Sequence, residues 1–293
     1  MVHPVTREVP GEYTTIQAAI DASYDQDTVL ISPGTYQENI SYDGKNIVVM
    51  STYLLENDST IIDQTIINGD ENGSVVVFAA GESENSVLQG LTLTNGNGNY
   101  ADPDGNGSYY TYGGGVYCQN ASPMLKDLII KDNSGNEGGG GGIFCYNASP
   151  TLIGCTISDN ITNDVGGGLY ARDGSNLVLI NVEFIDNEAE FGAGCYLRHE
   201  SVPSMTNVTF ADNIAANSGG GIVLKDNADA VMDQVHIEGN IAEGLGGGVY
   251  INNADPNIEY CLIADNTASS GGGFYVRNNS DPIMSNITIA YNN

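Results

Sequence analysis

The sequence predicts an all-β solenoid, in which short strands coil repeatedly and each strand pairs with its equivalent one coil further on. Two recurring residues carry this prediction. A glycine motif, such as Gly-Gly-Gly-Leu-Tyr at 166–170, returns with its third glycine 25 to 27 residues apart, at Gly115, Gly142, Gly168, Gly194, Gly221, Gly248 and Gly273. An asparagine keeps step with it, at Asn133, Asn160, Asn187, Asn213, Asn240, Asn266 and Asn292. A fixed period of this length is typical of stacked supersecondary units.

Each asparagine ends a predicted strand with one buried face. Apolar residues stand three and five positions before it, as Ile130 and Leu128 do before Asn133. This period of two is typical of a half-buried strand. The glycines fit the corners of a coil, because glycine adopts positive φ and lets backbones approach closely. We expect each asparagine amide to bond to the asparagine of the next coil.

The chain is expected to have two parts. Residues 1–60 form an N-terminal cap and a first irregular coil, and a short amphipathic helix at 15–22 covers the end of the core. Residues 61–293 form the regular solenoid of about 26-residue coils, with a loop inserted at 98–112 where the asparagine spacing is too long. Strands of the first, less regular coils are predicted at 28–31, 47–50, 61–62, 75–78 and 87–93.

The C-terminal end is expected to lack a cap, because the sequence stops at the end of a repeat strand. Either the natural protein continues, or another chain covers the end. An uncapped coil exposes core residues and unpaired strand groups, which predicts end-to-end self-association.

Composition limits the partners. The chain has 37 acidic and 8 basic residues, for a net charge of −29. A nucleic-acid partner is excluded, since phosphate binding requires lysine and arginine. No apolar stretch is long enough to insert into a membrane, and no signal peptide follows Met1. The acidity fits a secreted or surface-displayed protein with affinity for cations, from which any export signal has been removed.

The five cysteines match no zinc-binding spacing, and an odd number cannot pair completely. Cys118 and Cys145 hold equivalent positions on adjacent coils, so their Cα atoms should lie about 4.8 Å apart. That separation permits a disulfide. A stacked pair of buried thiols fits equally well.

Alternation after the glycines predicts an exposed strip. The inward positions are apolar, so tyrosines and, two residues further on, basic residues should point outward. Four of the 8 basic residues stand in this file. Aromatic rings stack on sugars and cations pair with carboxylates or sulfates, which predicts an acidic polysaccharide or cell-surface glycan as partner. The binding residues would be Tyr170, Tyr196, Tyr250, Arg172, Arg198 and Arg277. Alternatively, the tyrosines only stabilise the sheet, and the cations pair with neighbouring acids.

The next file is rich in asparagine, but Asp173, His199 and Asp226 occupy it on three consecutive coils. Carboxylates beside an imidazole orient it for proton transfer. β-Elimination from a sugar acid needs a cation to hold the carboxylate and a base to take the proton. The catalytic set would be His199, Arg198, Lys225, Asp173 and Asp226, with Tyr196 as a further candidate. Alternatively, aspartate replaces asparagine at a turn, and His199 is a solvated surface residue.

A calcium site is predicted in the inserted loop. Asp102, Asp104 and Asn106 alternate before Gly107, as in the first half of an EF-hand loop. The twelfth position is Gly113 and not glutamate, so a complete EF-hand is excluded. The same residues also make ordinary turns.

These features together resemble right-handed parallel β-helices of the pectin-lyase-like kind, and in particular large secreted bacterial surface proteins. The coils are similar to those of chlamydial polymorphic membrane proteins, whose Phe-x-x-Asn signature is matched at 184–187 and 210–213, while Gly-Gly-Gly replaces their Gly-Gly-Ala. Residues 13–40 resemble the start of many such helices, pectin methylesterases included. The resemblance covers nearly the whole chain and implies the fold.

The resemblance leaves function open, because this fold hosts lyases, hydrolases, esterases, epimerases and adhesins. The Asn-Thr-Asp and Gly-His-Gly patterns of polygalacturonases and the Asp-Pro-His-Asp of alginate epimerases are missing. One hypothesis is a secreted or surface-displayed module that binds glycans, adheres or serves as a structural spacer. The alternative is a polysaccharide lyase that acts on an acidic polysaccharide by β-elimination.

Overall fold

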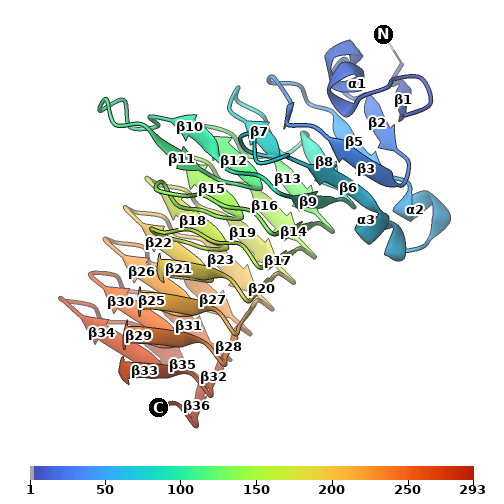
Figure 1. The fold of residues 1–293 in the computed structure, drawn as a ribbon. Helices are drawn as coiled ribbons and strands as arrows, with labels where there is room; N and C mark the ends of the chain where they lie inside the picture. Colours follow the sequence, from blue (N-terminus) through green and yellow to red (C-terminus); the bar gives the residue numbers. More distant parts are fainter. Residues whose placement is uncertain (1–2) are drawn as a thin grey trace.

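The computed structural model describes residues 3–293 and confirms the predicted fold class. The chain winds into a parallel β-helix, and each strand pairs in parallel with the equivalent strand of the next coil (Figure 1). Three long sheets run along the stack, and a fourth, shorter sheet accompanies the later coils. No helix in residues 3–293 is long and apolar enough to cross a membrane.

Sheets A and B bring the residues between the glycine motifs into register. Sheet A stacks β1 (Thr6–Val9), β2 (Thr28–Ile31), β5 (Val48–Ser51), β8 (Val87–Gln89), β13 (Met124–Lys126), β16 (Thr151–Ile153), β19 (Val178–Ile180), β23 (Ser204–Thr206), β27 (Val231–Asp233), β31 (Asn257–Glu259) and β35 (Ile283–Ser285). Sheet B stacks β3 (Gly34–Gln37), β6 (Thr65–Asn68), β9 (Thr92–Thr94), β14 (Ile129–Lys131), β17 (Thr156–Ser158), β20 (Glu183–Ile185), β24 (Thr209–Ala211), β28 (His236–Glu238), β32 (Leu262–Ala264) and β36 (Thr288–Ala290).

Sheet C follows the glycine motifs and carries most of the predicted site. It stacks β4 (Ile40–Ser41), β7 (Val76–Phe78), β12 (Val116–Gln119), β15 (Ile143–Tyr146), β18 (Leu169–Arg172), β22 (Cys195–Arg198), β26 (Ile222–Lys225), β30 (Val249–Asn252) and β34 (Phe274–Arg277). The short sheet stacks β21 (Glu188–Phe191), β25 (Ile214–Ser218), β29 (Ile241–Leu245) and β33 (Thr267–Ser270). The sequence did not lead us to expect the short sheet.

The first coils differ from the rest. Helix α1 (Ile16–Ala22) is capped by Thr15, whose hydroxyl accepts the Ala18 N–H at 3.2 Å, and it buries Ile16, Ala19 and Ile20. It lies at the N-terminal end of the stack, as expected for a cap (Figure 1). The strand predicted at 61–62 is wrong: Ile61 lies in helix α3 (Thr60–Gln64), which follows helix α2 (Tyr53–Glu56). Thr60 begins this turn with bonds to the Asp58 carboxylate, so the backbone is helical there.

Residues 98–112 contain an antiparallel hairpin, β10 (Asn99–Ala101) and β11 (Tyr110–Tyr112), joined by the loop of the predicted calcium motif. The hairpin projects from the side of the stack beside β12 (Figure 1). At the far end, the last coil leaves core-type residues open: Ile283 is 67% exposed and Ile289 is 55% exposed.

The recurring asparagines form a ladder, which we call the Asn ladder and of which all members except the last are buried: Asn133, Asn160, Asn187, Asn213, Asn240, Asn266 and Asn292. Each side-chain amide nitrogen donates to the amide oxygen of the next member, as from Asn187 Nδ2 to Asn213 Oδ1 at 2.9 Å. The same oxygen accepts the backbone N–H of Asn187 at 3.0 Å. The expected bond between successive asparagines is therefore confirmed.

The glycine motif makes the corner that follows. Its first residue, as in Gly140 with φ +68°, has the left-handed backbone that glycine adopts without strain. Its third residue is packed against the next coil: a Cβ on Gly142 would lie 2.6 Å from the Gly168 carbonyl oxygen. Glycine is therefore required for two reasons: the turn needs a left-handed backbone at the first residue, and the next coil leaves no room for a side chain at the third.

The five cysteines at positions 118, 145, 155, 195 and 261 are all buried free thiols. Cys118 and Cys145 face each other across β12 and β15, as their equivalent positions predict. The structure therefore favours the stacked thiols over the disulfide. Burial, followed by the neighbouring Cys145, holds the pKa of Cys118 well above its usual range, so this thiol is neutral.

Candidate functional site

Sheet C has both faces buried, which contradicts the expected exposed strip. The predicted register is right: Leu169 and Ala171 point into the main core, while Tyr170 belongs to a separate cluster on the other side. However, the outward rings are covered, and Tyr170, Tyr196 and Tyr250 are 2%, 6% and 9% exposed. The predicted role of these three faces as an open stacking surface is therefore wrong.

The cover comes from the segment between each asparagine and the following glycines. This segment folds back over sheet C as the short sheet and its preceding turns, and it packs Val165, Phe191 and Leu245 onto the tyrosine file. The rings then contact one another, with Phe144 and Tyr170 centroids 5.3 Å apart and Tyr170 and Tyr196 at 5.7 Å. Such pairs stabilise a sheet, as in the alternative interpretation of the file.

Burial also affects the chemistry of the tyrosines. It raises the pKa of Tyr196 to about 12, although the nearby Arg198 opposes this shift. The phenol therefore stays protonated near neutral pH. This argues against Tyr196 as the proton-abstracting base.

Arg172 is buried and already paired. Its guanidinium binds Asp104 of the hairpin loop at 2.8 Å and the neighbouring Asp173, and its Cζ lies 5.4 Å from the Tyr146 ring centroid. It is 8% exposed. The predicted role of Arg172 in substrate binding is therefore not supported, because its charge is neutralised and it serves to hold the hairpin against sheet C.

Arg198 and Lys225 are the available cations of the file. They are partners in the parallel register of β22 and β26, so their side chains lie side by side on adjacent coils. Both are half-buried. Arg198 lies over the Tyr170 ring at 5.5 Å, and its Nε is buried without a hydrogen-bond partner. The closest carboxylate oxygen of Lys225 is that of Asp226, at 3.8 Å.

Two neighbouring cavities adjoin Arg198. The first, of about 270 Å³, lies under the hairpin and has Tyr110, Glu137 and Arg172 in its wall. The second, of about 260 Å³, is lined by Phe191, Tyr196 and Tyr250 together with Lys225. We call them the hairpin pocket and the lysine pocket. Arg198 and Asp164 line both, so they form the shared wall.

Asp164 is a site residue that the sequence did not reveal. Its side-chain oxygens accept no hydrogen bond within the part of the chain that the structure describes. Burial raises its pKa, Arg198 opposes that shift, and Glu190 adds to it. The only available signal was its position one residue before Val165 and two before the Gly166 corner, in a segment whose path over sheet C was not predicted.

The Asp-His-Asp triplet is brought together as predicted. It belongs to the corner file, which consists of Asn120, Asn147, Asp173, His199, Asp226, Asn253 and Asn278. His199 Nδ1 lies 3.6 Å from Asp173 Oδ1, and Nε2 lies 3.7 Å from Asp226 Oδ2. All three line an open hollow of about 540 Å³. The imidazole is thus bracketed by carboxylates at a surface that a ligand can reach.

The backbone conformation of the corner file explains which residue types occupy it. Every member has positive φ, from +46° at Asn147 to +57° at Asp173. Asparagine, aspartate and histidine tolerate this left-handed conformation better than other non-glycine residues. The turn therefore selects the class of residue, and the choice of histidine and aspartate in three coils needs a further reason.

The predicted calcium ligands are engaged within the protein. The Asp102 carboxylate accepts the backbone N–H groups of Asn106 and Gly107 at 3.1 and 2.7 Å, which closes the loop. Asp104 binds Arg172. Over residues 3–293, no three histidine, cysteine, aspartate or glutamate side chains gather as a metal site would require. Calcium binding at this loop stays a prediction.

Arg277 lies apart from the other cations. It belongs to the exposed last coil, where its register partner on the preceding coil is Asn252. Tyr250 stacks on Tyr275 at 5.9 Å beside it. The predicted binding residues therefore do not form one continuous strip, because the coil that carries Asn252 separates Arg277 from Lys225.

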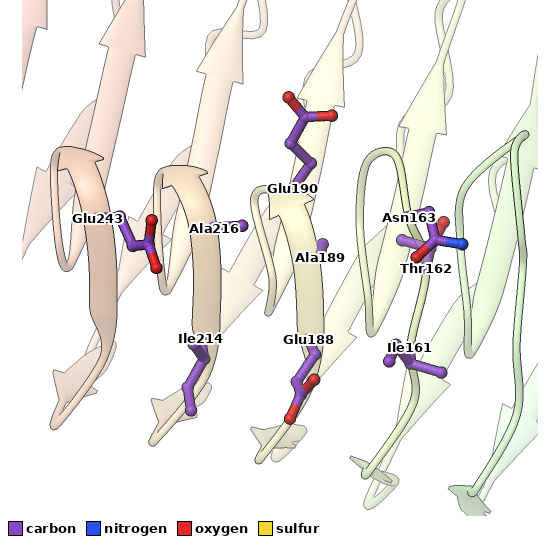
Figure 2. A pocket seen from close by; sticks show the side chains of 9 residues that line it. All are labelled: Ile161, Thr162, Asn163, Glu188, Ala189, Glu190, Ile214, Ala216 and Glu243. Atoms are coloured by element: carbon purple, nitrogen blue, oxygen red, sulfur yellow. The ribbon is translucent and has the colours of Figure 1, made fainter.

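A further hollow, of about 440 Å³, lies on the short sheet. Figure 2 shows Glu188 and Glu190 on β21 and Glu243 on β29, with Ile214 on β25 between these two strands and Ile161 on the preceding coil. No basic side chain lines it. A polyanion would be repelled there, so this hollow is not the counterpart of the cavities beside Arg198.

The sequence matches a family profile described as the right-handed beta helix region, over residues 22–231 and 193–293. The chain belongs to this family. No curated protein sequence matches it. The fold class thus agrees with the resemblance to right-handed β-helices, while the narrower similarity to bacterial surface proteins stays a prediction.

A comparison with solved structures gives several matches to this family member. The A-module of mannuronan C-5 epimerase from Azotobacter vinelandii superposes with a TM-score of 0.55 at 18% identity, covering 93% of this chain and 71% of that one. Pectin methylesterase from Aspergillus niger gives 0.47 at 13% identity, covering 97% and 84%. An exopolygalacturonase from Yersinia enterocolitica gives 0.40 at 10%, covering 99% and 78%. At such identities the likeness shows the fold alone.

Proposed function

We propose that this protein is a secreted or surface-displayed module that binds an acidic polysaccharide at Arg198 and Lys225. One observation carries the proposal. In a chain with 37 acidic and 8 basic residues, these two cations stand side by side on adjacent coils, and neither is closely paired. A buried Arg198 Nε without a partner points to a ligand that supplies the missing acceptor.

The repeat geometry suits a polymer. Equivalent residues on neighbouring coils are about 4.8 Å apart, a distance comparable with the length of one sugar unit. A saccharide chain that runs along the stack would therefore meet one coil per unit. The A-module similar in fold is named for mannuronan, an acidic polysaccharide, and this name agrees with the proposed ligand class.

Titration at low salt tests the proposal. Alginate, pectate and a sulfated glycan should bind, and affinity should fall as salt screens the exposed charges. Arg198→Gln should weaken binding about tenfold, since it removes a charge-assisted contact. Lys126→Gln is the matched control, because Lys126 lies on sheet A and lines neither pocket. Absence of binding to all three polymers would overturn the proposal.

A polysaccharide lyase is the second candidate, and the bracketed His199 favours it. In β-elimination, His199 would take the proton from the carbon beside the sugar carboxylate, while Arg198 or Lys225 holds that carboxylate. The C–H electron pair forms the C=C bond, and the glycosidic C–O bond breaks with its electrons on the leaving oxygen. A growing ultraviolet absorbance from the unsaturated product would identify this activity. Binding without product would favour the module.

End-to-end self-association belongs to the same proposal, because a surface module of this kind can extend by stacking. The exposed Ile283 and Ile289 on the last coil support it. Ile283→Asp should shift the sedimentation coefficient towards that of the monomer at concentrations where the unmodified chain associates. A monomer at every concentration tested would contradict the association.

A further inference from the structure

The two pockets that share Arg198 differ sharply in charge. The lysine pocket has two cations, Arg198 and Lys225, and one carboxylate, Asp164. The hairpin pocket also has two arginines, but three carboxylates face them: Asp104, Glu137 and Asp164. Because Arg172 is bound to Asp104 and Asp173, the hairpin pocket has a single uncommitted cation, Arg198, opposite Glu137 and Asp164.

The lysine pocket suits an anionic sugar. Lys225 and Arg198 can pair with a carboxylate or sulfate, and Asn252 adds an amide at the rim. Phe191, Tyr196 and Tyr250 supply apolar wall for the ring. Asp164 is the one group there that would repel an anion, and burial raises its pKa, which eases its neutralisation.

The hairpin pocket suits a neutral sugar rich in hydroxyl groups. A carboxylate such as that of Glu137 accepts hydrogen bonds from hydroxyls but repels a second anion. Ser108 and Tyr110 on the hairpin add hydroxyls of their own. Glu137 is exposed and makes no side-chain hydrogen bond within residues 3–293, so its acceptors are free for a ligand.

We propose that the two pockets bind adjacent unlike units of one polysaccharide, an anionic unit in the lysine pocket and a neutral unit in the hairpin pocket. The ligand class is then an acidic polysaccharide that alternates charged and uncharged sugars, and a homopolyuronate is a poorer ligand. This inference rests on the proposed function and narrows its substrate.

Calorimetric titration with oligosaccharides of equal length tests it. The probes are a hyaluronan tetrasaccharide, which alternates glucuronate with a neutral amino sugar, and tetragalacturonate, in which every unit is charged. The alternating probe should bind about tenfold more tightly, since only tetragalacturonate places a carboxylate against Glu137. Equal affinity, or tighter binding of tetragalacturonate, would overturn the inference and leave the proposed function standing. Absence of binding to either probe and to the polymers above would overturn both.

A charge variant gives a second, independent readout. Glu137→Gln should raise the affinity for tetragalacturonate about threefold by removing the repulsion, and it should lower the affinity for the alternating probe, because an amide accepts hydrogen bonds from hydroxyls less strongly than a carboxylate does. Glu238→Gln removes an equal charge from β28 on sheet B, away from both pockets, and serves as the control. A gain of the same size in the control would mean that net charge, and not the hairpin pocket, discriminates the ligands, and the inference would be wrong.

Discussion

The Asn ladder and the corner file both turn the chain with a column of polar side chains, but they differ in burial. Members of the Asn ladder such as Asn187 are fully buried and bonded to the coils on either side. Members of the corner file such as Asp173 and His199 are half-exposed. The buried column repeats asparagine without exception, whereas the exposed column is broken on three consecutive coils.

This difference distinguishes positions where the fold requires asparagine from positions where another residue can serve function. A buried amide that accepts two bonds and donates two has no substitute of the same shape and bonding, so the fold itself demands asparagine. The corner file only demands a residue that tolerates positive φ. At Asp173 the departure from asparagine has a structural reason, because its carboxylate pairs with Arg172. At His199 the imidazole lies beyond hydrogen-bond distance of its neighbouring carboxylates, and it stands next to the cations Arg198 and Lys225. Local exceptions to a repeat are where function is best sought.

The largest effect is expected for breaking the Asn ladder. Asn187→Leu removes bonds to Asn160 and Asn213 and to the Ile157 carbonyl, and leaves buried partners without hydrogen bonds. The free energy of unfolding should fall by about 3 kcal/mol or more, measured by urea denaturation. Asn147→Gly in the corner file should change it by less than about 1 kcal/mol, because glycine keeps the positive φ. Equal losses in both variants would remove the distinction between the columns.

A smaller loss is expected for Arg172, which links the corner file to the hairpin. Arg172→Gln leaves Asp104 and Asp173 without their buried cation, and should cost about 2 kcal/mol of unfolding free energy. Lys225→Gln should cost less than about 0.5 kcal/mol, because its nearest carboxylate is 3.8 Å away and both side chains are half-exposed. A more destabilising Lys225→Gln would show that the two cations have been assigned the wrong roles.

The period and the alternation in the sequence were enough to predict the coil, the register of sheet C and the stacking of Asp173, His199 and Asp226. They were not enough to predict what covers sheet C. The segment 188–191 carries two glutamates and alternates only around one small residue, Ala189, so it lacks the apolar pattern that marks a strand. Its equivalents Ala215, Ala242 and Ala268 were the available signal. Without that layer, Tyr170 was expected in solvent and the pocket wall at Asp164 was missed.

The pH dependence of binding tests the role of Asp164 in the wall that the two pockets share. Because the folded-state pKa of Asp164 is raised above its usual 3.8, the folded state holds this proton more strongly than the unfolded state. Its contribution to stability therefore falls as pH rises through that raised pKa. Affinity for a sulfated glycan, which stays ionised, should rise about threefold as pH falls through the same range. In Asp164→Asn this part of the dependence should vanish. An unchanged pH profile in the variant would remove Asp164 from the site.

Calcium binding at Asp104 would compete directly with the Arg172–Asp104 ion pair. The Asp104 oxygen that binds Arg172 is not free for a cation, so Arg172→Gln should release it. The rise in melting temperature on adding calcium, reversed by chelator, should be small in the unmodified chain and larger in Arg172→Gln. Asp104→Asn in the variant background should abolish the rise. Identical melting with calcium and with chelator in all three proteins would contradict calcium binding at this loop.

The smallest effect on stability is expected for restoring the repeat residue at position 199. His199→Asn places an asparagine where four other coils have one, and asparagine tolerates the φ of +53°. The free energy of unfolding should change by less than about 0.5 kcal/mol, because the imidazole lies beyond hydrogen-bond distance of both carboxylates.

The His199→Asn variant therefore tests function with the fold held constant. If the protein is a binding module, affinity for an acidic polysaccharide should persist, since Arg198 and Lys225 are untouched. If it is a lyase, formation of the unsaturated product should cease while binding continues. A large loss of stability in His199→Asn would show that the corner file is constrained by the fold after all, and that its departure from asparagine is not a mark of function.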